Sequence, residues 1–210
     1  MNYCDLNSLL RKILRVLEEK QVELNRMDAN IGDGDHGRTI VNAFRNVLKQ
    51  TQDFKYENAA EGLIKIGRIL AFSTGAAAGP LFGSAFMEAG KKVKGKEKLI
   101  LENWADALKG AAEGVIKRGK ANIGDKTMLD TLHPAAEALV NSVQEGDSLE
   151  QGLTKALEMA KKGMESTKDL ISKRGRSSRL GERTKGHIDP GAASSYYILE
   201  VIIKNCLEKG

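Results

Sequence analysis

The sequence predicts an all-α fold in a single domain. Apolar residues recur at spacings of three and four along most of the chain, and a two-residue alternation is nowhere sustained. Only three prolines occur in 210 residues, which suits long helices. No internal repeat or long linker divides the chain, and domains commonly have about 100–200 residues. We therefore expect one domain over residues 1–210.

Eight apolar stripes mark the expected helices, and each fits a 3.6-residue period. They cover residues 9–17, 40–48, 60–70, 80–89, 104–115, 132–143, 149–164 and 190–206. Pro80 and Pro190 begin two of these stripes, where the fixed φ and missing N–H of proline suit a first helical position. The prediction is thus about eight amphipathic helices and no sheet.

Composition narrows the class of protein. Apolar residues make up 41% and charged residues 29%, which argues against a disordered, collagen-like or membrane protein. The first twenty residues carry charges within their apolar pattern, unlike a signal peptide. Cys4 and Cys206 stand at opposite ends of the chain and predict two unpaired thiols in a reducing compartment. We expect a cytoplasmic protein with no membrane association.

The net charge of +5 is unevenly distributed. Between Lys161 and His187 there are nine Lys and Arg residues against three Asp and Glu residues. This stretch contains no Phe, Tyr or Trp on which bases could stack, which argues against nucleic acid. A solvated surface, a phosphate site and a protein-partner site remain open.

The densest polar stretch is Met-Asp-Ala-Asn-Ile-Gly-Asp-Gly-Asp-His-Gly at residues 27–37. Its three carboxylates, Asp28, Asp33 and Asp35, repel one another unless water or a cation separates them. Oxygen ligands favour Mg²⁺, Mn²⁺ or Ca²⁺ over zinc, and the EF-hand pattern fails because no Glu occupies its twelfth position. Mg²⁺ with a phosphate ligand is the leading interpretation, and a solvated loop is the alternative.

Two patterns in this sequence resemble phosphate loops. Gly32-x-Gly34-x-x-Gly37 matches the dinucleotide fingerprint literally, but no apolar strand or βαβ unit surrounds it. Residues 119–127 approach the GxxxxGK[ST] loop with one inserted residue. Together with the small residues at 75–80, they predict Gly-flanked helix N-termini that can bind an anion. Close helix packing is the alternative for residues 75–80.

Taken together, these stretches resemble the L subunit of dihydroxyacetone kinase. The resemblance rests on Gly-Asp-Gly-Asp-His-Gly at 32–37, GAAAGPLFG at 75–83 and RGKA at 118–121. It continues with GDKTM at 124–128, LGER at 180–183 and GHIDPG at 186–191, in order along nearly the whole chain. It implies a barrel of eight antiparallel helices, with ADP or ATP tightly bound together with two Mg²⁺ ions among the loops at one end.

The resemblance also implies roles for individual residues. Asp28, Asp33 and Asp35 are the expected Mg²⁺ ligands, and Arg176 is the expected catalytic residue. The nucleotide contacts that it implies are His36, Gly37, Arg38, Thr39, Ala77, Ala78, Gly119, Met128, Arg176, Asp189, Pro190 and Gly191. Ala78 and Thr39 replace a frequent serine and a frequent asparagine, so a phosphate contact at Ala78 must come from the backbone.

The activity that the resemblance implies requires partners. Dihydroxyacetone is held covalently on a separate K subunit, and a phosphohistidine on an M subunit rephosphorylates the ADP in place. A nucleotide domain of this length favours the phosphotransferase-system type over fused kinases. The alternatives are a two-subunit ketose kinase that exchanges ATP and a non-catalytic ADP-binding regulator. A homodimer and the identity of the ketose stay open.

Overall fold

The computed structural model describes residues 3–208, and their side chains from residue 6 onward. The helices in order are α1 (Tyr3–Glu19), α2 (Gln21–Ile31), α3 (His36–Thr51), α4 (Ala59–Phe72), α5 (Ala78–Lys92), α6 (Leu101–Gly119), α7 (Leu129–Glu145), α8 (Leu149–Ser166), the 3₁₀ segments η1 (Thr167–Asp169) and η2 (Arg176–Thr184), and α9 (Pro190–Leu207). No strand occurs within these residues. The all-α prediction is confirmed.

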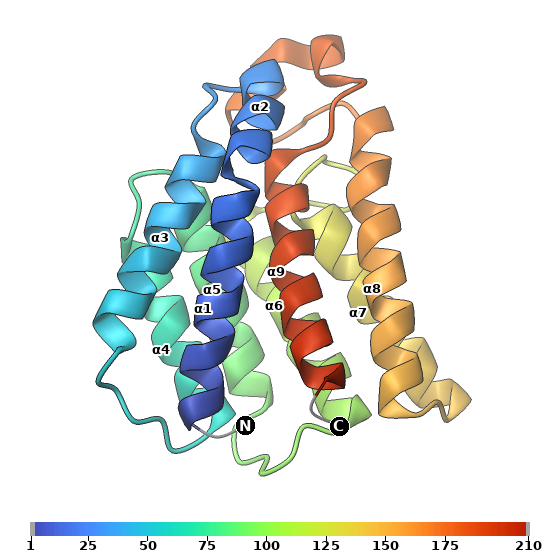
Figure 1. Cartoon of the computed structure of the whole chain (residues 1–210). Helices are drawn as coiled ribbons and strands as arrows, with labels where there is room; N and C mark the ends of the chain where they lie inside the picture. The colour runs from blue at the N-terminus through green and yellow to red at the C-terminus, as the bar shows by residue number, and fades with distance from the viewer. Residues whose placement is uncertain (1–2, 209–210) are drawn as a thin grey trace.

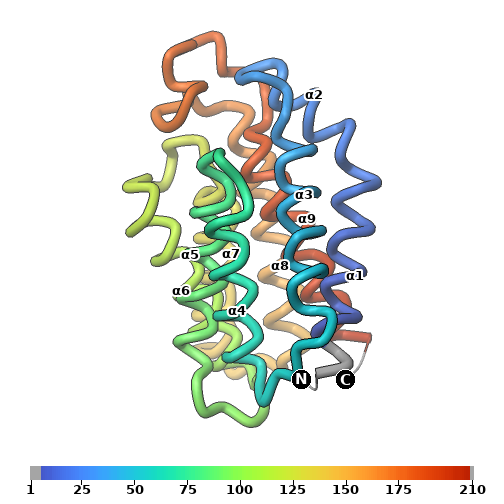
Figure 2. The backbone as a smooth tube through the Cα atoms, turned by 90° about the vertical axis from the view of Figure 1, so that its left-hand side faces the viewer, coloured from blue at the N-terminus to red at the C-terminus, as the bar shows by residue number. Residues whose placement is uncertain are grey.

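The long helices stand side by side around a common core (Figure 1). From α3 to α9 each helix packs against the next, while α1 contacts both α3 and α9. Short connections reverse the chain direction between neighbours (Figure 2). As a result α3, α5, α7 and α9 all begin at the end of the molecule opposite the two termini. The glycine-rich loops gather at that same end.

The core is apolar along the length of the molecule. Its largest fully buried side chains include Phe44, Leu10, Ile13, Leu70 and Leu139. Burying such side chains stabilises the fold by about 1.5–3 kcal/mol each. Within the described part of the chain, no helix is both long enough and apolar enough to span a bilayer.

The pair α7 and α8 packs closely at a proline. Pro134 lies inside α7 and has no N–H to give to the Asp130 carbonyl, four residues earlier. That carbonyl oxygen instead lies against Gly163 of α8, where an added Cβ would overlap it. A residue without a side chain is therefore required at Gly163.

The structure has one helix more than the sequence analysis predicted, and several helices begin earlier. The nine α-helices of the described region include α2, which has no recognisable apolar stripe because only Leu24 and Ile31 are buried. Helix α5 begins at Ala78, so Pro80 is its third residue, where an N–H still has no intrahelical partner. Helix α7 begins at Leu129 rather than near Leu132.

The cysteine prediction is tested at one position. Cys206 is a free thiol on α9. The side chain of Cys4 lies outside the described residues.

Candidate functional site

A cleft of about 550 Å³ opens at the loop end of the helices. Helix ends and connecting loops from across the sequence form its walls. The loops that join these helices gather at this end of the molecule (Figure 2). Of the residues predicted from the sequence, those that line it are Asp28, Asp33, Asp35, His36, Thr39, Ala77, Ala78, Gly119, Met128, Arg176, Asp189, Pro190 and Gly191. The structure thus brings six separate segments to one cavity.

Three carboxylates meet on one side of the cleft. Asp28 lies in the last turn of α2, while Asp33 and Asp35 follow in the short connection to α3. One oxygen of each lies within 4.8 Å of the others. Such a set of oxygen donors fits a hard divalent cation such as Mg²⁺. Asp28 also accepts hydrogen bonds from the backbone N–H groups of Asp35 and His36, at 2.9 and 3.1 Å, which orders the loop.

Arg176 lies directly beside the carboxylates, on η2, which packs against α2. It begins η2 and forms an ion pair with Asp33. The neighbouring lysines of the basic stretch lie elsewhere: Lys161 and Lys162 pair with glutamates along the exposed face of α8. Arg176 is therefore placed to contact an anion that binds a cation held by the aspartates.

The N-termini of α3, α5, α7 and α9 converge on the cleft. Each helix N-terminus carries a partial positive charge and N–H groups without intrahelical partners. No side chain caps the start of α5, where Ala77 and Ala78 offer only methyl groups and backbone. This arrangement suits a phosphate-bearing ligand.

Three ionisable groups that line the cleft have shifted pKa values: His36, Asp189 and Lys126, whose pKa is lowered mainly by burial. Burial lowers the pKa of His36, against the opposing charges of Asp28 and Asp35. Its Nε2 lies 2.9 Å from the Ser194 hydroxyl, within hydrogen-bond distance. Burial raises the pKa of Asp189 to about 7, although the N–H groups of Ala192 and Gly191 and the charge of Lys126 oppose this.

Two predicted nucleotide contacts do not line the cleft. Gly37 is buried where α3 crosses α2, and a Cβ there would overlap the Gln21 carbonyl oxygen. Arg38 is exposed, and its guanidinium lies 3.6 Å from Asp35. Gly37 lies at the contact between α3 and α2, and Arg38 is linked to the cleft only through its ion pair with Asp35.

Other lining residues were not predicted as site residues from the sequence. They are Ile31, Gly32, Ala76, Pro80, Leu81, Phe82, Val115, Arg118, Ala121, Lys126, Thr127, Arg174, Gly175 and Ser177. Most belong to motifs already noted, including Leu81 and Phe82 in GAAAGPLFG, whereas Val115 is indistinguishable in sequence from an ordinary core position.

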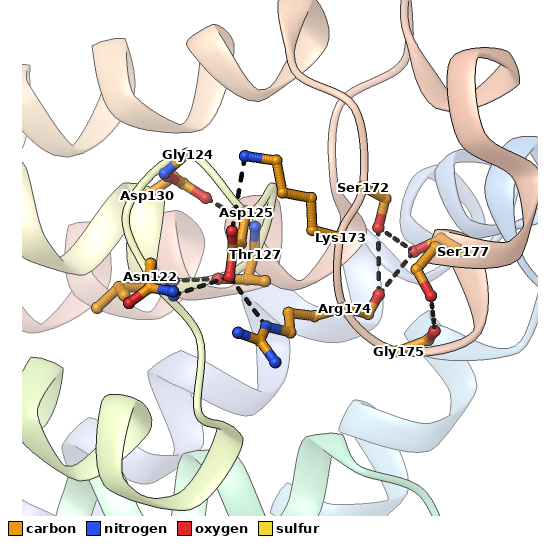
Figure 3. Close-up of polar contacts among 12 residues, drawn as sticks. Asn122, Gly124, Asp125, Thr127, Asp130, Ser172, Lys173, Arg174, Gly175 and Ser177 are labelled. Carbon is orange, nitrogen blue, oxygen red and sulfur yellow. Dashed lines mark hydrogen bonds and ion pairs between the residues drawn. The ribbon is translucent and has the colours of Figure 1, made fainter.

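A buried polar cluster behind the cleft joins two of its loops (Figure 3). The Asp125 carboxylate accepts hydrogen bonds from the Asn122 N–H and from the Arg174 guanidinium, both at 2.9 Å. Burial alone would raise the pKa of Asp125, but these hydrogen bonds and the charges of Arg174 and Lys173 lower it overall. The Asp130 carboxylate accepts hydrogen bonds from the Gly124 and Thr127 N–H groups. The 120–128 loop is thereby attached to the segment that carries Arg176.

Fold and site together define an all-α protein with a cleft for an anionic ligand and a divalent cation. Comparison with known proteins agrees with this class. The DAK2 domain family matches residues 30–204. The chain is 38% identical over 199 residues to PEP-dependent dihydroxyacetone kinase 2, ADP-binding subunit DhaL, of Listeria innocua, covering 94% of this chain and 92% of that one. The corresponding DhaL subunit of Escherichia coli is 36% identical over 179 residues, 85% of each chain.

Solved structures show the same relationship. The dihydroxyacetone kinase of C. freundii superposes with a TM-score of 0.71 and 27% identity, over 95% of this chain. The chain spans only 34% of that larger kinase. A second structure of that kinase, in complex with AMP-PNP and Mg²⁺, gives a TM-score of 0.69. This chain belongs to the DAK2 domain family.

Proposed function

We propose that this chain is the nucleotide-binding subunit of a phosphotransferase-system-dependent dihydroxyacetone kinase in the cytoplasm. It would hold ADP, receive a phosphoryl group from the phosphohistidine of an M subunit, and pass it to dihydroxyacetone on a K subunit. The observation that carries the proposal is the convergence of Asp28, Asp33 and Asp35 with four helix N-termini and Arg176 on one cleft. The names of the DhaL relatives, which align over most of both chains, support it.

Each part of the cleft has a task in this reaction. Asp28, Asp33 and Asp35 would hold Mg²⁺, which neutralises phosphate charge when bound. The uncapped start of α5 offers backbone N–H groups to phosphate oxygens. Arg176 adds a guanidinium, which can stabilise negative charge that develops on the transferred phosphoryl group. Phosphoryl transfer depends mainly on such positioning and charge stabilisation, so this chain needs no general base of its own.

The first test is the nucleotide that the purified protein retains. Mass spectrometry of protein denatured after gel filtration should release ADP in near-stoichiometric amount. The Asp35→Asn variant should release far less, because one ligand charge is lost, while the exposed Asp106→Asn on α6 should behave as wild type. Equal retention in both variants would contradict the metal assignment.

The second test separates the phosphotransferase route from exchange with ATP. The chain is assayed with its K and M partners and phosphoenolpyruvate, and separately with the K partner and ATP alone. We expect dihydroxyacetone phosphate only in the first reaction. Turnover with ATP alone would support an ATP-exchanging kinase, and no turnover in either reaction would favour an ADP-binding regulator.

A further inference from the structure

Lys126 is the one lysine with a fully buried side chain among the described residues; its exposed fraction is 1%. It lies in the loop between α6 and α7, with a backbone φ of 61° in the left-handed region. Non-glycine residues adopt that region rarely, and lysines are almost never buried without a partner. The surroundings of its ammonium group therefore need a physical explanation.

The ammonium group is enclosed by backbone carbonyls. Nζ donates to the Thr167 oxygen at 2.6 Å, to the Leu170 oxygen at 3.2 Å and to the His187 oxygen. A lysine ammonium has three N–H donors, so these carbonyls use all of them. Burial lowers the pKa of Lys126, while the charges of Asp189, Asp169 and Asp130 oppose this shift. The head group has no donor left for a phosphate.

The three carbonyls belong to segments that are distant from Lys126 in the sequence. Thr167 and Leu170 lie at and just beyond η1, and His187 stands two residues before Asp189 at the start of α9. The same segments are joined to each other by the Gly186 N–H, which donates to the Lys168 oxygen at 2.7 Å, and by the Asp189 N–H, which donates to the Thr167 hydroxyl at 3.0 Å. The ammonium group of Lys126 thus links the 120–128 loop to both ends of the basic loop, residues 170–187.

We propose that Lys126 is a positioning residue for the nucleotide cleft. Its ammonium sets the spacing between Met128 on its own loop and Asp189–Gly191 at the start of α9, all of which line the cleft. Nucleotide affinity then depends on a lysine that does not contact the nucleotide. This inference rests on the proposed function. The role it gives Lys126 differs from the direct phosphate contact that the lysine of a GxxxxGK[ST] loop makes.

The experiment compares ligand-free backbone exchange with nucleotide affinity. In Lys126→Met, hydrogen–deuterium exchange of the ligand-free protein should be faster at the Gly186 and Asp189 amides. Calorimetric titration with Mg-ADP should show a Kd raised about tenfold or more, because three hydrogen bonds to a charged donor are lost. The Lys126→Arg variant retains the charge and several N–H donors in a different geometry, and its Kd should lie between those of the Met variant and the wild type.

A stability control comes from the other end of the molecule. Leu153→Ala removes a buried side chain four residues into α8. It should lower the melting temperature while leaving the two amides and the Kd unchanged. Loss of affinity in Leu153→Ala equal to that in Lys126→Met would overturn the positioning role. So would unaltered exchange in Lys126→Met with lost affinity, which would indicate a direct phosphate contact.

Failure of the proposed function would look different. Wild-type protein that does not bind Mg-ADP would overturn that function, and a nucleotide role for Lys126 with it. Exchange at Gly186 and Asp189 would still report whether Lys126 holds the two segments. Should Lys126→Met fail to fold, the Arg variant carries the test: faster exchange at the two amides together with a raised Kd would support the positioning role, and wild-type exchange together with a raised Kd would overturn it.

Discussion

At the scale of single residues, Arg176 differs from its basic neighbours by position rather than by charge. It forms an ion pair with Asp33 at the cleft, whereas Lys162 pairs with Glu158 at 2.6 Å on the surface of α8. We expect Arg176→Ala to lower kcat by about a hundredfold in the assay with K and M partners, because a donor aimed at developing charge is lost. Lys162→Ala should change kcat by less than about twofold. Equal losses would indicate a diffuse docking surface instead.

The pKa of Asp189 predicts a pH dependence of stability. Its folded-state pKa of about 7 lies above the ordinary value of 3.8. The folded state therefore holds a proton that the unfolded state releases, and stability falls as pH rises from about 4 to 7, by at most about 1.4 kcal/mol per pH unit from this group. Asn keeps an oxygen that can accept from the Ala192 N–H as the helix cap.

The Asp189→Asn variant should thus lose less stability between pH 5 and pH 7 than the wild type. Urea unfolding of ligand-free protein at several pH values measures the difference. Parallel pH profiles for the two proteins would show that the Asp189 carboxyl titrates with an ordinary pKa.

The sequence alone could identify site residues where charged side chains are crowded together. Asp28, Asp33 and Asp35 are recognisable because three carboxylates in a short glycine-rich stretch repel one another unless a cation or water separates them. Lys126 could not be interpreted correctly, since the Gly-Asp-Lys-Thr pattern suggests a phosphate contact and only the fold shows three carbonyls around its ammonium. The cleft is also lined by Leu81, Phe82 and Val115, whose helical spacing does not distinguish them from core residues.

At the scale of elements, the contact between α7 and α8 makes a matched pair of glycine substitutions informative. A Cβ at Gly163 would overlap the Asp130 carbonyl oxygen, which is backbone. A Cβ at Gly152, which is also on α8, would meet the end of the flexible Leu101 side chain. We expect Gly163→Ala to destabilise the protein by about 1–3 kcal/mol. Gly152→Ala should be nearly neutral, because Ala gains about 1 kcal/mol in helix propensity.

Urea or thermal unfolding distinguishes the two variants. Similar stability of Gly163→Ala and Gly152→Ala would mean that α7 and α8 can move apart at Pro134 without loss.

A helix could be predicted from the sequence where it buries many apolar residues, and could not where it buries few. The stripe of α3 buries Ile40, Val41, Phe44 and Val47 and appears clearly in the sequence. Helix α2 buries little, and its position depends on contacts with α3 and α9. The 167–189 segment is held mainly by backbone and hydroxyl hydrogen bonds, which leave no periodic pattern.

At the scale of the whole molecule, chain reversal explains why the site lies at one end. Alternating helices place four N-termini together, and their partial positive charges add to those of the basic loop. The aspartates offset part of this charge. The cleft therefore holds opposed charges that a Mg²⁺-nucleotide ligand would match, which couples ligand binding to the stability of the loops.

This coupling predicts that removing metal and nucleotide destabilises the protein. A ligand that binds only the folded state stabilises it by RT ln(1 + [L]/Kd), about 4 kcal/mol at a thousandfold excess over Kd. For a domain of this size about 1 kcal/mol corresponds to roughly 2–4 °C, so EDTA treatment with removal of nucleotide should lower Tm by on the order of 10 °C. The Asp35→Asn variant, already deficient in metal binding, should show a much smaller change on the same treatment. If Tm stays constant in wild-type protein first shown to contain ADP, the nucleotide is held by the helix N-termini and basic loop alone, and Asp28, Asp33 and Asp35 do not bind a metal.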